Sequence, residues 1–258
     1  MQHKHPHVAV ITGAASPRGI GWATALALAD SGIAVAVADL QHDGVEELAN
    51  LIRHRGGRAL ALKADVSLRA DVDALYAEVA RELGEPDILV ANAGITQSIA
   101  FSEISELEWD RMLTINLKSV YHCCQAALPF MRRRQWGRIV FVSSMVARDG
   151  GGFGACHYAA AKAGMLGLAR CLAREVAKDN ITVNSVTPGS IDTDILKGRT
   201  AERGGKDAEA YQRERIARTP LGRLGSAADV ASAIHFFATR GDFCTGAIVD
   251  VNGGRFMG

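Results

Sequence analysis

The chain has 258 residues and a mass of 27.4 kDa, and 48% of the residues are hydrophobic against 22% charged, which is typical of a globular protein with one or two domains. Its 29 basic and 28 acidic side chains leave a formal net charge of +1, which argues against a protein that mainly binds nucleic acid or an anionic membrane surface. The longest run without a charged residue, 88–102, is shorter than the ~20 residues of a bilayer span and excludes a transmembrane helix.

Short apolar runs rich in β-branched residues alternate with longer amphipathic segments along the chain. The expected strands are Val8–Thr12, Ala34–Ala38, Ala59–Lys63, Ile88–Ala91, Arg138–Ser143, Ile181–Val186 and Ala247–Val251. The expected helices are Gly21–Ser31, Gly44–His54, Asp71–Leu83, Trp109–Met131, Tyr158–Ala177 and Ala227–Ala238. Strands that are apolar on both faces indicate a parallel sheet covered on both sides. We therefore predict an α/β fold, a single Rossmann-type doubly wound parallel sheet of about seven strands with helices on both faces, forming one domain over residues 1–258.

The segment 189–218 interrupts this alternation. It is long and polar, and its basic residues include Lys197, Arg199, Arg203 and Lys206. A segment of this kind between a strand and a helix often forms a mobile lid over the carboxyl edge of a sheet. We predict a lid-like insertion at about 189–218, with a plain surface excursion as the alternative.

A glycine-rich turn joins the first strand to the first helix. Gly13, Gly19 and Gly21 permit a tight turn, and the backbone N–H groups at the start of a helix bind phosphate. Because the turn stands directly between a strand and a helix, it predicts the pyrophosphate site of a dinucleotide.

The second strand ends at Asp39, where an acid would hydrogen-bond the ribose 2′-hydroxyl of NAD and repel the 2′-phosphate of NADP. Arg18 within the turn favours NADP instead. We predict NAD as the cofactor, with NADP as the alternative, because Asp39 would lie at the ribose itself. A structural acid near the start of the next helix is the other interpretation of Asp39.

Tyr158 and Lys162 are four residues apart, so on a helix they project from one face. A free tyrosine has a pKa of ~10, and a nearby ammonium group stabilises the phenolate and lowers that pKa. Such a pair can accept a proton from an alcohol while a hydride leaves its carbon.

Ser143 and Ser144 follow the fifth strand, at the edge where open α/β sheets bind ligands, and a hydroxyl there can hydrogen-bond a substrate oxygen. Asn116 lies within a long expected helix, where a polar amide is unfavourable and therefore indicates a specific role. It either holds a water that connects Lys162 to solvent or satisfies a backbone carbonyl.

From Val8 to Gly254 the chain resembles the short-chain dehydrogenase/reductase family, in its common branch of ~250-residue enzymes. The ordered matches are Thr12-Gly13, Gly19-Ile20-Gly21, Asp65-Val66, Asn92-Ala93-Gly94, Asn116, Ser144, Tyr158, Lys162 and Pro188-Gly189 with Thr193. The resemblance implies that Tyr158 is the general acid/base and that Lys162 binds the nicotinamide ribose and lowers the pKa of Tyr158. It also implies that Ser144 orients the substrate and that Asn116 anchors the water of a proton relay.

The resemblance and the positions of residues in the chain together define the candidate binding residues. The cofactor-binding residues expected are Gly13, Ser16, Arg18, Gly19, Ile20, Gly21, Asp39, Leu40, Asp65, Val66, Asn92, Ala93, Gly94, Tyr158, Lys162, Pro188, Gly189, Ile191 and Thr193. The substrate-binding residues expected are Thr96, Gln97, Ser144, Val146, Gly154, Tyr158 and Ser190. No metal is expected, because the five cysteines form no CxxC pair.

Two departures from the family pattern affect these assignments. Five residues separate Gly13 from Gly19, two more than the family has, which puts the roles of Ser16 and Arg18 in doubt. Ser144 also lies one residue further from Tyr158 than is common. The three consecutive glycines of 150–152 can absorb that residue, and Ser143 is the alternative to Ser144.

The expected function is that of an NAD-dependent oxidoreductase that interconverts a secondary alcohol and a ketone, on a polyol, sugar or other small hydroxy compound. The alternative is an NADP-dependent reductase of 3-oxoacyl thioesters on acyl carrier protein, for which Arg132, Arg133, Arg134 and Arg174 match basic positions, although arginine near a helix C-terminus is favourable by itself. A non-catalytic dinucleotide sensor is a third interpretation, disfavoured because Tyr158 and Lys162 are both present. The resemblance further implies a homotetramer, and the N-terminus lacks the features of a signal peptide, so we expect a cytoplasmic enzyme.

Overall fold

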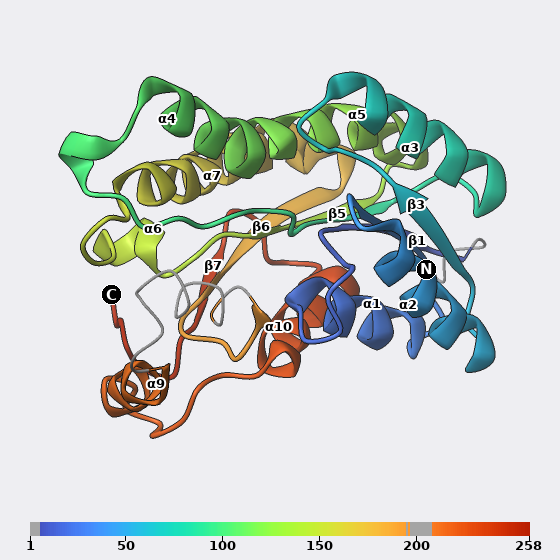
Figure 1. Cartoon of the computed structure of the whole chain (residues 1–258). Helices are drawn as coiled ribbons and strands as arrows, with labels where there is room; N and C mark the ends of the chain where they lie inside the picture. The colour runs from blue at the N-terminus through green and yellow to red at the C-terminus, as the bar shows by residue number, and fades with distance from the viewer. Residues whose placement is uncertain (1–5, 195, 197–207) are drawn as a thin grey trace.

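The apolar runs of the sequence pair into one sheet of seven parallel strands, in the order β3-β2-β1-β4-β5-β6-β7 (Figure 1). The computed structural model describes residues 6–194, 196 and 208–258. The strands are β1 Val8–Thr12, β2 Ala34–Asp39, β3 Ala59–Lys63, β4 Ile88–Ala91, β5 Gly137–Val142, β6 Ile181–Pro188 and β7 Ile248–Val251. The predicted doubly wound sheet is confirmed.

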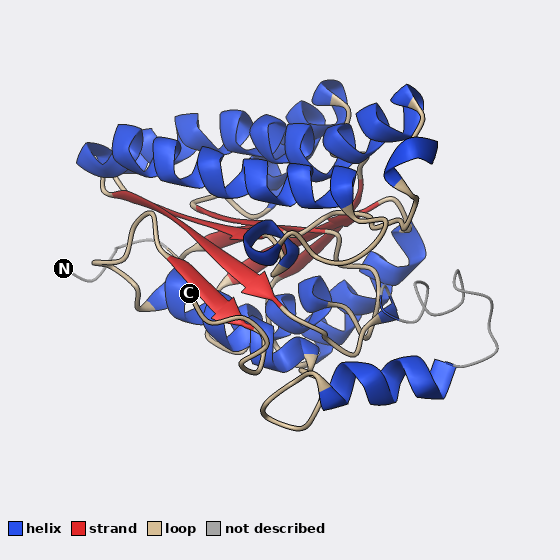
Figure 2. Cartoon of the chain, turned by 90° about the vertical axis from the view of Figure 1, so that its left-hand side faces the viewer, coloured by secondary structure: helices blue, strands red, loops and turns tan. Residues whose placement is uncertain are grey.

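Helices cover both faces of this sheet (Figures 1 and 2). One layer holds α1 Ile20–Ala29, α2 His42–His54 and α10 Ala227–Thr239, and the other holds α3 Arg69–Glu82, α5 Ser119–Arg134 and α7 Cys156–Val176. Successive strand residues face opposite layers, so Val10 packs into one hydrophobic core and Ile11 into the other. This is why the strands read as continuous apolar runs rather than as alternating patterns.

The order of the strands reverses beside β1. Ile11 of β1 is paired with Val37 of β2 on one side and with Val90 of β4 on the other. The chain therefore winds outward in one direction through β2 and β3 and in the opposite direction from β4 to β7. A crevice forms at the carboxyl ends of the strands at such a reversal, and ligands of open α/β sheets bind there.

The single helix predicted over 109–131 is interrupted. It begins as α4 Glu106–Leu113, passes through a π-helical turn at Thr114–Lys118, and continues as α5. The π turn contains Asn116, the polar residue that is unfavourable in a regular helix. Turns of this kind are rare and often occur at functional sites.

The segment after β6 also differs from the prediction, because residues 208–217 form a helix, α9 Ala208–Ala217. Before it, Ile191 pairs with Gly225 in an isolated parallel bridge. The central part of the predicted lid, residues 195 and 197–207, lies outside the described residues, and so do Lys197, Arg199, Arg203 and Lys206. A further short helix, α6 Val146–Asp149, follows β5.

None of the described helices is both long and apolar enough to cross a membrane.

Candidate active site

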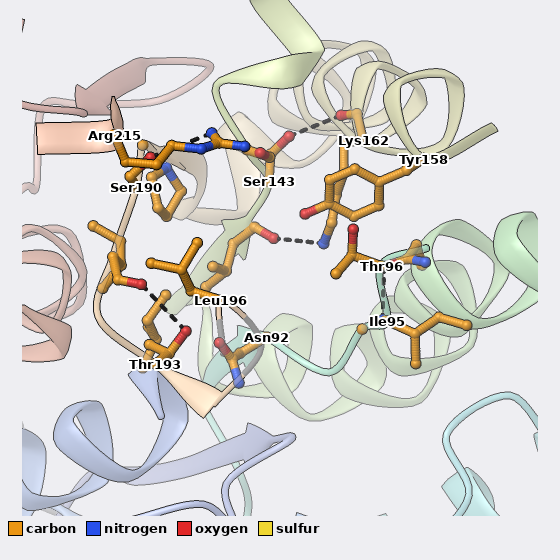
Figure 3. Close-up of a pocket in the computed structure, with 18 residues that line it drawn as sticks. Asn92, Ile95, Thr96, Ser143, Tyr158, Lys162, Ser190, Thr193, Leu196 and Arg215 are labelled. Atoms are coloured by element: carbon orange, nitrogen blue, oxygen red, sulfur yellow. Dashed lines mark hydrogen bonds between the residues drawn. The ribbon is translucent and has the colours of Figure 1, made fainter. Parts of the chain in front are cut away.

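An open cavity lies at the carboxyl edge of the sheet, beside the reversal of strand order (Figure 3). All four predicted catalytic residues line it, namely Asn116, Ser144, Tyr158 and Lys162. The predicted cofactor residues that also line it are Ile20, Asn92, Gly94, Pro188, Gly189, Ile191 and Thr193. Segments that are far apart in the sequence therefore meet at one site.

Tyr158 and Lys162 come from the first turns of α7, one helical turn apart. Lys162 is only 4% exposed, its Nζ donates a hydrogen bond to the carbonyl oxygen of Val142 (2.9 Å), and it lies 5.9 Å from the centre of the Tyr158 ring. Burial lowers the pKa of Lys162 from 10.5 to about 8. The amine beside the phenol is therefore still mostly protonated at neutral pH.

The two serines after β5 have different surroundings. The Ser143 hydroxyl is buried and donates to the carbonyl oxygen of Lys162 (2.8 Å), which holds the end of β5 against α7. The Ser144 hydroxyl accepts a long hydrogen bond from the backbone N–H of Val146 (3.4 Å), and no acceptor for its own proton is found among the described residues. Both residues line the cavity, but only the Ser143 hydroxyl donates a hydrogen bond to another described residue.

Asn116 connects the π turn to the end of β4. Its Nδ2 donates to the carbonyl oxygen of Met112 (3.1 Å), which is the structural role weighed above, and its Oδ1 accepts from the backbone N–H of Ile95 (3.2 Å). A Cβ at Gly94 would lie 2.5 Å from Asn116 Oδ1 and 3.3 Å from Lys162 Nζ. Glycine is therefore needed at position 94 because Asn116 and Lys162 converge there.

The glycine-rich turn is held tightly against the end of β4. Gly13 has a φ of +69°, and a Cβ there would lie 2.6 Å from the Cα of Ala93. Asn92 Nδ2 donates to the carbonyl oxygens of Thr12 (2.9 Å) and Gly13 (2.8 Å), while Thr12 Oγ1 accepts from the backbone N–H groups of Asn92 and Ala93. A Cβ at Gly21 would lie 2.5 Å from the Gly13 carbonyl oxygen. These close approaches explain why the turn uses glycine at both places.

The start of α1 fits the pyrophosphate of a dinucleotide. Its N-cap residue is Gly19, which has no side chain to cap the helix, so the first N–H groups of α1 remain available to an anion. Ile20, the first residue of α1, lines the cavity that contains Tyr158. A dinucleotide bound at the turn would thus extend from the end of β2 toward Tyr158.

Asp39 lies at the carboxyl end of β2, next to the glycine-rich turn. Its carboxylate accepts hydrogen bonds from the backbone N–H groups of Ala15 (3.1 Å) and Gln41 (3.2 Å). It does not line the cavity, and neither does Asp65, whose Oδ1 accepts from the backbone N–H and the hydroxyl of Ser67.

Ser16 and Arg18, in the lengthened part of the turn, face two acids that follow β6. The Ser16 hydroxyl donates to Asp194 (2.6 Å), and the Arg18 guanidinium donates to Asp192 (2.5 Å). Neither side chain lines the cavity. In this structure the positive charge of Arg18 is therefore matched by a carboxylate of the chain itself.

Some expected residues lie outside the cavity. Six further cofactor candidates do not line it, namely Gly13, Gly19, Gly21, Leu40, Val66 and Ala93. Of the substrate candidates, Thr96, Ser144, Tyr158 and Ser190 line the cavity, whereas Gln97, Val146 and Gly154 do not. Gln97 donates to Glu108 instead (3.5 Å), and a Cβ at Gly154 would lie 2.6 Å from the Ser98 hydroxyl oxygen and 2.9 Å from the backbone nitrogen of Ile99.

Four lining residues, Ile95, Val142, Leu196 and Arg215, were not named individually from the sequence. Arg215 projects from α9, which lies within the segment 189–218 that was predicted to form a lid-like insertion. The sequence signal for α9 was its composition of alanine, glutamate, glutamine and arginine, all good helix formers, rather than an apolar period.

Comparisons with known proteins agree with this geometry. A family model described as enoyl-(acyl carrier protein) reductase matches residues 13–255. The uncharacterised short-chain type dehydrogenase/reductase y4mP of Sinorhizobium fredii is 43% identical to this chain, and the match covers 96% of this chain and 97% of the relative. The 3-oxoacyl-[acyl-carrier-protein] reductase FabG of Pseudomonas aeruginosa is 39% identical, and the match covers 97% of both chains. A crystal structure from Burkholderia xenovorans, assigned to the short-chain dehydrogenases/reductases, has a TM-score of 0.90 at 33% identity, with 96% of both chains covered.

Proposed function

Because the chain belongs to the short-chain dehydrogenase/reductase family, we propose that it is an NAD-dependent oxidoreductase that interconverts a secondary alcohol and a ketone on a small hydroxy compound. The observation that carries the proposal is the buried Lys162 amine 5.9 Å from the Tyr158 ring, in the cavity that adjoins the glycine-rich turn. A catalytic acid/base next to a dinucleotide-shaped cleft suits hydride transfer at carbon coupled to proton transfer at oxygen.

The cofactor supplies a hydride acceptor for alcohol oxidation and a hydride donor for ketone reduction. The N–H groups at the start of α1 would hold its pyrophosphate, and Asp39 would bind its adenosine ribose. Thr193 and Lys162 line the cavity that contains Tyr158, where they would hold the nicotinamide end. Ser16 and Arg18 would have to leave Asp194 and Asp192 to take part.

Proton transfer would take place at the Tyr158 hydroxyl oxygen. In oxidation, the phenolate accepts the proton of the substrate hydroxyl, and the Lys162 ammonium stabilises that phenolate electrostatically. The Ser144 hydroxyl, with its proton uncommitted, would donate a hydrogen bond to the same substrate oxygen. Asn116 fixes the end of β4 beside Lys162, and a water anchored in the π turn would return the proton to solvent.

Asp39 supports NAD over NADP. A carboxylate at the end of β2, tied to the turn through Ala15, would accept a hydrogen bond from a ribose 2′-hydroxyl and repel a 2′-phosphate. Arg18, the one group in the turn that favours a 2′-phosphate, already donates to Asp192.

Reduction of 3-oxoacyl thioesters on acyl carrier protein is the second candidate, favoured by the similarity to the reductase FabG. Against it, three of the arginines expected to meet an acidic carrier are paired within the chain: Arg132 with Asp179 (3.1 Å), Arg133 with Glu85 (2.8 Å) and Arg134 with Asp87 (2.6 Å). Turnover of an acetoacetyl thioester with NADPH in preference to small ketones with NADH would replace our proposal with this one.

Replacement of Tyr158 by Phe tests the proposed chemistry. We expect turnover to fall by roughly 1,000-fold or more because the proton acceptor is removed, while NADH binding stays nearly unchanged. Turnover is measured by the absorbance of the reduced nicotinamide, and NADH binding is measured by fluorescence titration. Unchanged turnover would refute Tyr158 as the acid/base, and a wild-type chain that binds NADH without any turnover would favour the non-catalytic sensor.

A further inference from the structure

Two arginines from distant parts of the chain converge on one hydroxyl at the edge of the cavity. Arg215 projects from α9, and its Nη1 lies 3.5 Å from Ser190 Oγ; Arg255 comes from the segment after β7 and donates to the same oxygen. Ser190 and Arg215 both line the cavity, on the side opposite Tyr158 and Lys162 in Figure 3.

Neither guanidinium forms an ion pair within the described part of the chain. Among the residues that the structure describes, no carboxylate lies within ion-pair distance of Arg215 or Arg255, whereas the neighbouring Arg218 is paired with Glu214 (2.9 Å). Arg215 also donates to the Tyr211 hydroxyl, and Asp149, which acts on Arg255 electrostatically, accepts from the backbone of Gly151.

The two charges also act on each other. The pKa of Arg255 is lowered first by burial and then by the positive charges of Arg215 and Arg218. Half-buried like charges that share one neutral hydroxyl repel, and that repulsion is relieved when an anion binds between them. Arginine is also the side chain best suited to carboxylate and related oxyanions, because its planar fork donates two parallel hydrogen bonds.

The backbone around both arginines is well anchored. Asn252, which is 7% exposed, donates to the carbonyl oxygen of Phe256 (3.0 Å) and accepts from the backbone of Gly254 (2.8 Å), so the turn that carries Arg255 is fixed. The Thr219 hydroxyl donates to the carbonyl oxygen of Arg215 (2.8 Å) at the end of α9. The cation pair is therefore built into the fold on two separate supports.

We propose that Arg215 and Arg255 bind an anionic group of the substrate, with Ser190 between them, so that the enzyme acts on hydroxy acids and their oxo acids. This inference rests on the proposed function. In oxidation the carbinol carbon of the hydroxy acid gives its hydride to NAD and its hydroxyl proton to Tyr158, yielding the oxo acid, NADH and one proton. The anionic group itself is unchanged and serves only to orient the molecule.

The test compares matched ketones with NADH as the reductant. The probes are 2-oxobutanoate, 3-oxobutanoate and 4-oxopentanoate, each with its methyl ester, and 2-oxopropane-1-sulfonate as a tetrahedral anion. For at least one spacing we expect the acid to exceed its ester in kcat/KM by roughly 10- to 100-fold, mainly through KM, because the charge is bound equally in ground and transition states. The best spacing would report the separation of Tyr158 from the arginines, and turnover of the sulfonate would extend the class from carboxylates to oxyanions in general.

Variants then assign the preference to these arginines. Arg215→Met and Arg255→Met should each lower the ratio of acid to ester by roughly 10-fold or more, since a charge-assisted hydrogen bond is lost. Arg218→Met is the matched control, because it removes an equal charge close by that is already paired with Glu214, and it should change the ratio by less than about twofold. Unfolding temperature and NADH binding verify that each variant is folded.

Two results would overturn the inference while leaving the proposed function intact. One is a wild-type enzyme that reduces acids and esters equally well, a comparison that needs no variant. The other is an equal fall in the ratio for Arg218→Met, which would indicate a general field rather than a site. Failure to reduce any of the ketones with either NADH or NADPH would instead refute the proposed function, and the inference with it.

Discussion

At the scale of single residues, Lys162 meets two opposing demands. In the proposed mechanism its ammonium form would stabilise the Tyr158 phenolate, but its burial favours the neutral amine and lowers its pKa to about 8. The hydrogen bond to the Val142 carbonyl oxygen compensates for only part of the lost hydration. The chain therefore loses stability at the place where the proposed chemistry needs a charge.

Replacement of Lys162 by Met should abolish turnover and stabilise the fold at neutral pH. Because the folded pKa of about 8 lies below the usual 10.5, the penalty for burying the charge is fully present below pH 8 and disappears as the pH rises to 10.5. After the lost hydrogen bond to Val142 is subtracted, we expect the free energy of unfolding to rise by on the order of 2 kcal/mol at pH 7 and less at pH 10. Urea unfolding at both pH values measures this, with the exposed Lys178→Met as control, and a destabilised variant at pH 7 would contradict it.

The same pKa predicts how the wild-type rate depends on pH. If the ammonium of Lys162 supports catalysis, ketone reduction should decline as the pH rises through about 8. A rate that stays constant between pH 7 and 10 would show that the charge of Lys162 is not required.

Asp39→Asn tests the choice of cofactor at a single atom. The amide keeps an acceptor oxygen for the backbone N–H of Ala15 but removes the charge that would repel a 2′-phosphate. We expect the ratio of kcat/KM for NADPH to that for NADH to rise by roughly 10- to 100-fold. Asp43→Asn, an exposed acid in the first turn of α2, is the control and should leave the ratio near its wild-type value. A wild-type preference for NADPH would contradict the assignment of Asp39.

At the scale of elements, the lengthened glycine-rich turn reaches across the cleft to the segment after β6. Its Ser16 and Arg18 contact Asp194 and Asp192, although these residues lie far apart in sequence. Arg18 and Asp192 are 43% and 47% exposed in their side chains, and exposed ion pairs stabilise a fold by only ~0–1 kcal/mol. A contact this weak can open when a dinucleotide enters.

The start of α10 has a stronger local device, a capping box. The Ser226 hydroxyl accepts from the backbone N–H of Asp229 (3.1 Å), and the Asp229 carboxylate accepts from the backbone N–H of Ser226 (2.7 Å). Ser226→Ala should lower the free energy of unfolding by about 1 kcal/mol. Chemical denaturation measures this, with Ser232→Ala, on the same helix but outside the cap, as the control that should not destabilise. Equal stability of Ser226→Ala and the wild type would show that the cap contributes nothing.

At the scale of the whole molecule, the position of the site follows from the reversal of strand order beside β1. The ends of β4, β5 and β6 bring Asn92, Ser144 and Ser190 to the same cavity, and α7 places Tyr158 over it. The two hydrophobic cores on either side of the sheet keep these strand ends in register. The site of the proposed chemistry is therefore set by topology, and the side chains that would perform it come from α7, the π turn and the end of β5.

The assembly expected from the family resemblance is a homotetramer, which we propose for this chain as well. In its support, Phe243 is fully exposed, and Val249 is exposed on β7, the last strand of the sheet, whose outer edge no described strand covers. Sedimentation equilibrium should give about four times the 27.4 kDa mass of the chain. A monomer at all concentrations would contradict this.

The sequence by itself determined the sheet, the glycine-rich turn and the Tyr158–Lys162 pair, because each depends on local periodicity or on a short fixed spacing. It did not predict the π turn around Asn116 or α9, whose composition favours a helix without an apolar stripe to mark it. Only the tertiary structure distinguished the role of Ser143 from that of Ser144. Neighbouring residues at a strand end point in different directions, and only the Ser143 hydroxyl donates a hydrogen bond to α7. It alone also joined Arg215 and Arg255 at Ser190, because contacts between distant segments leave no period in the sequence.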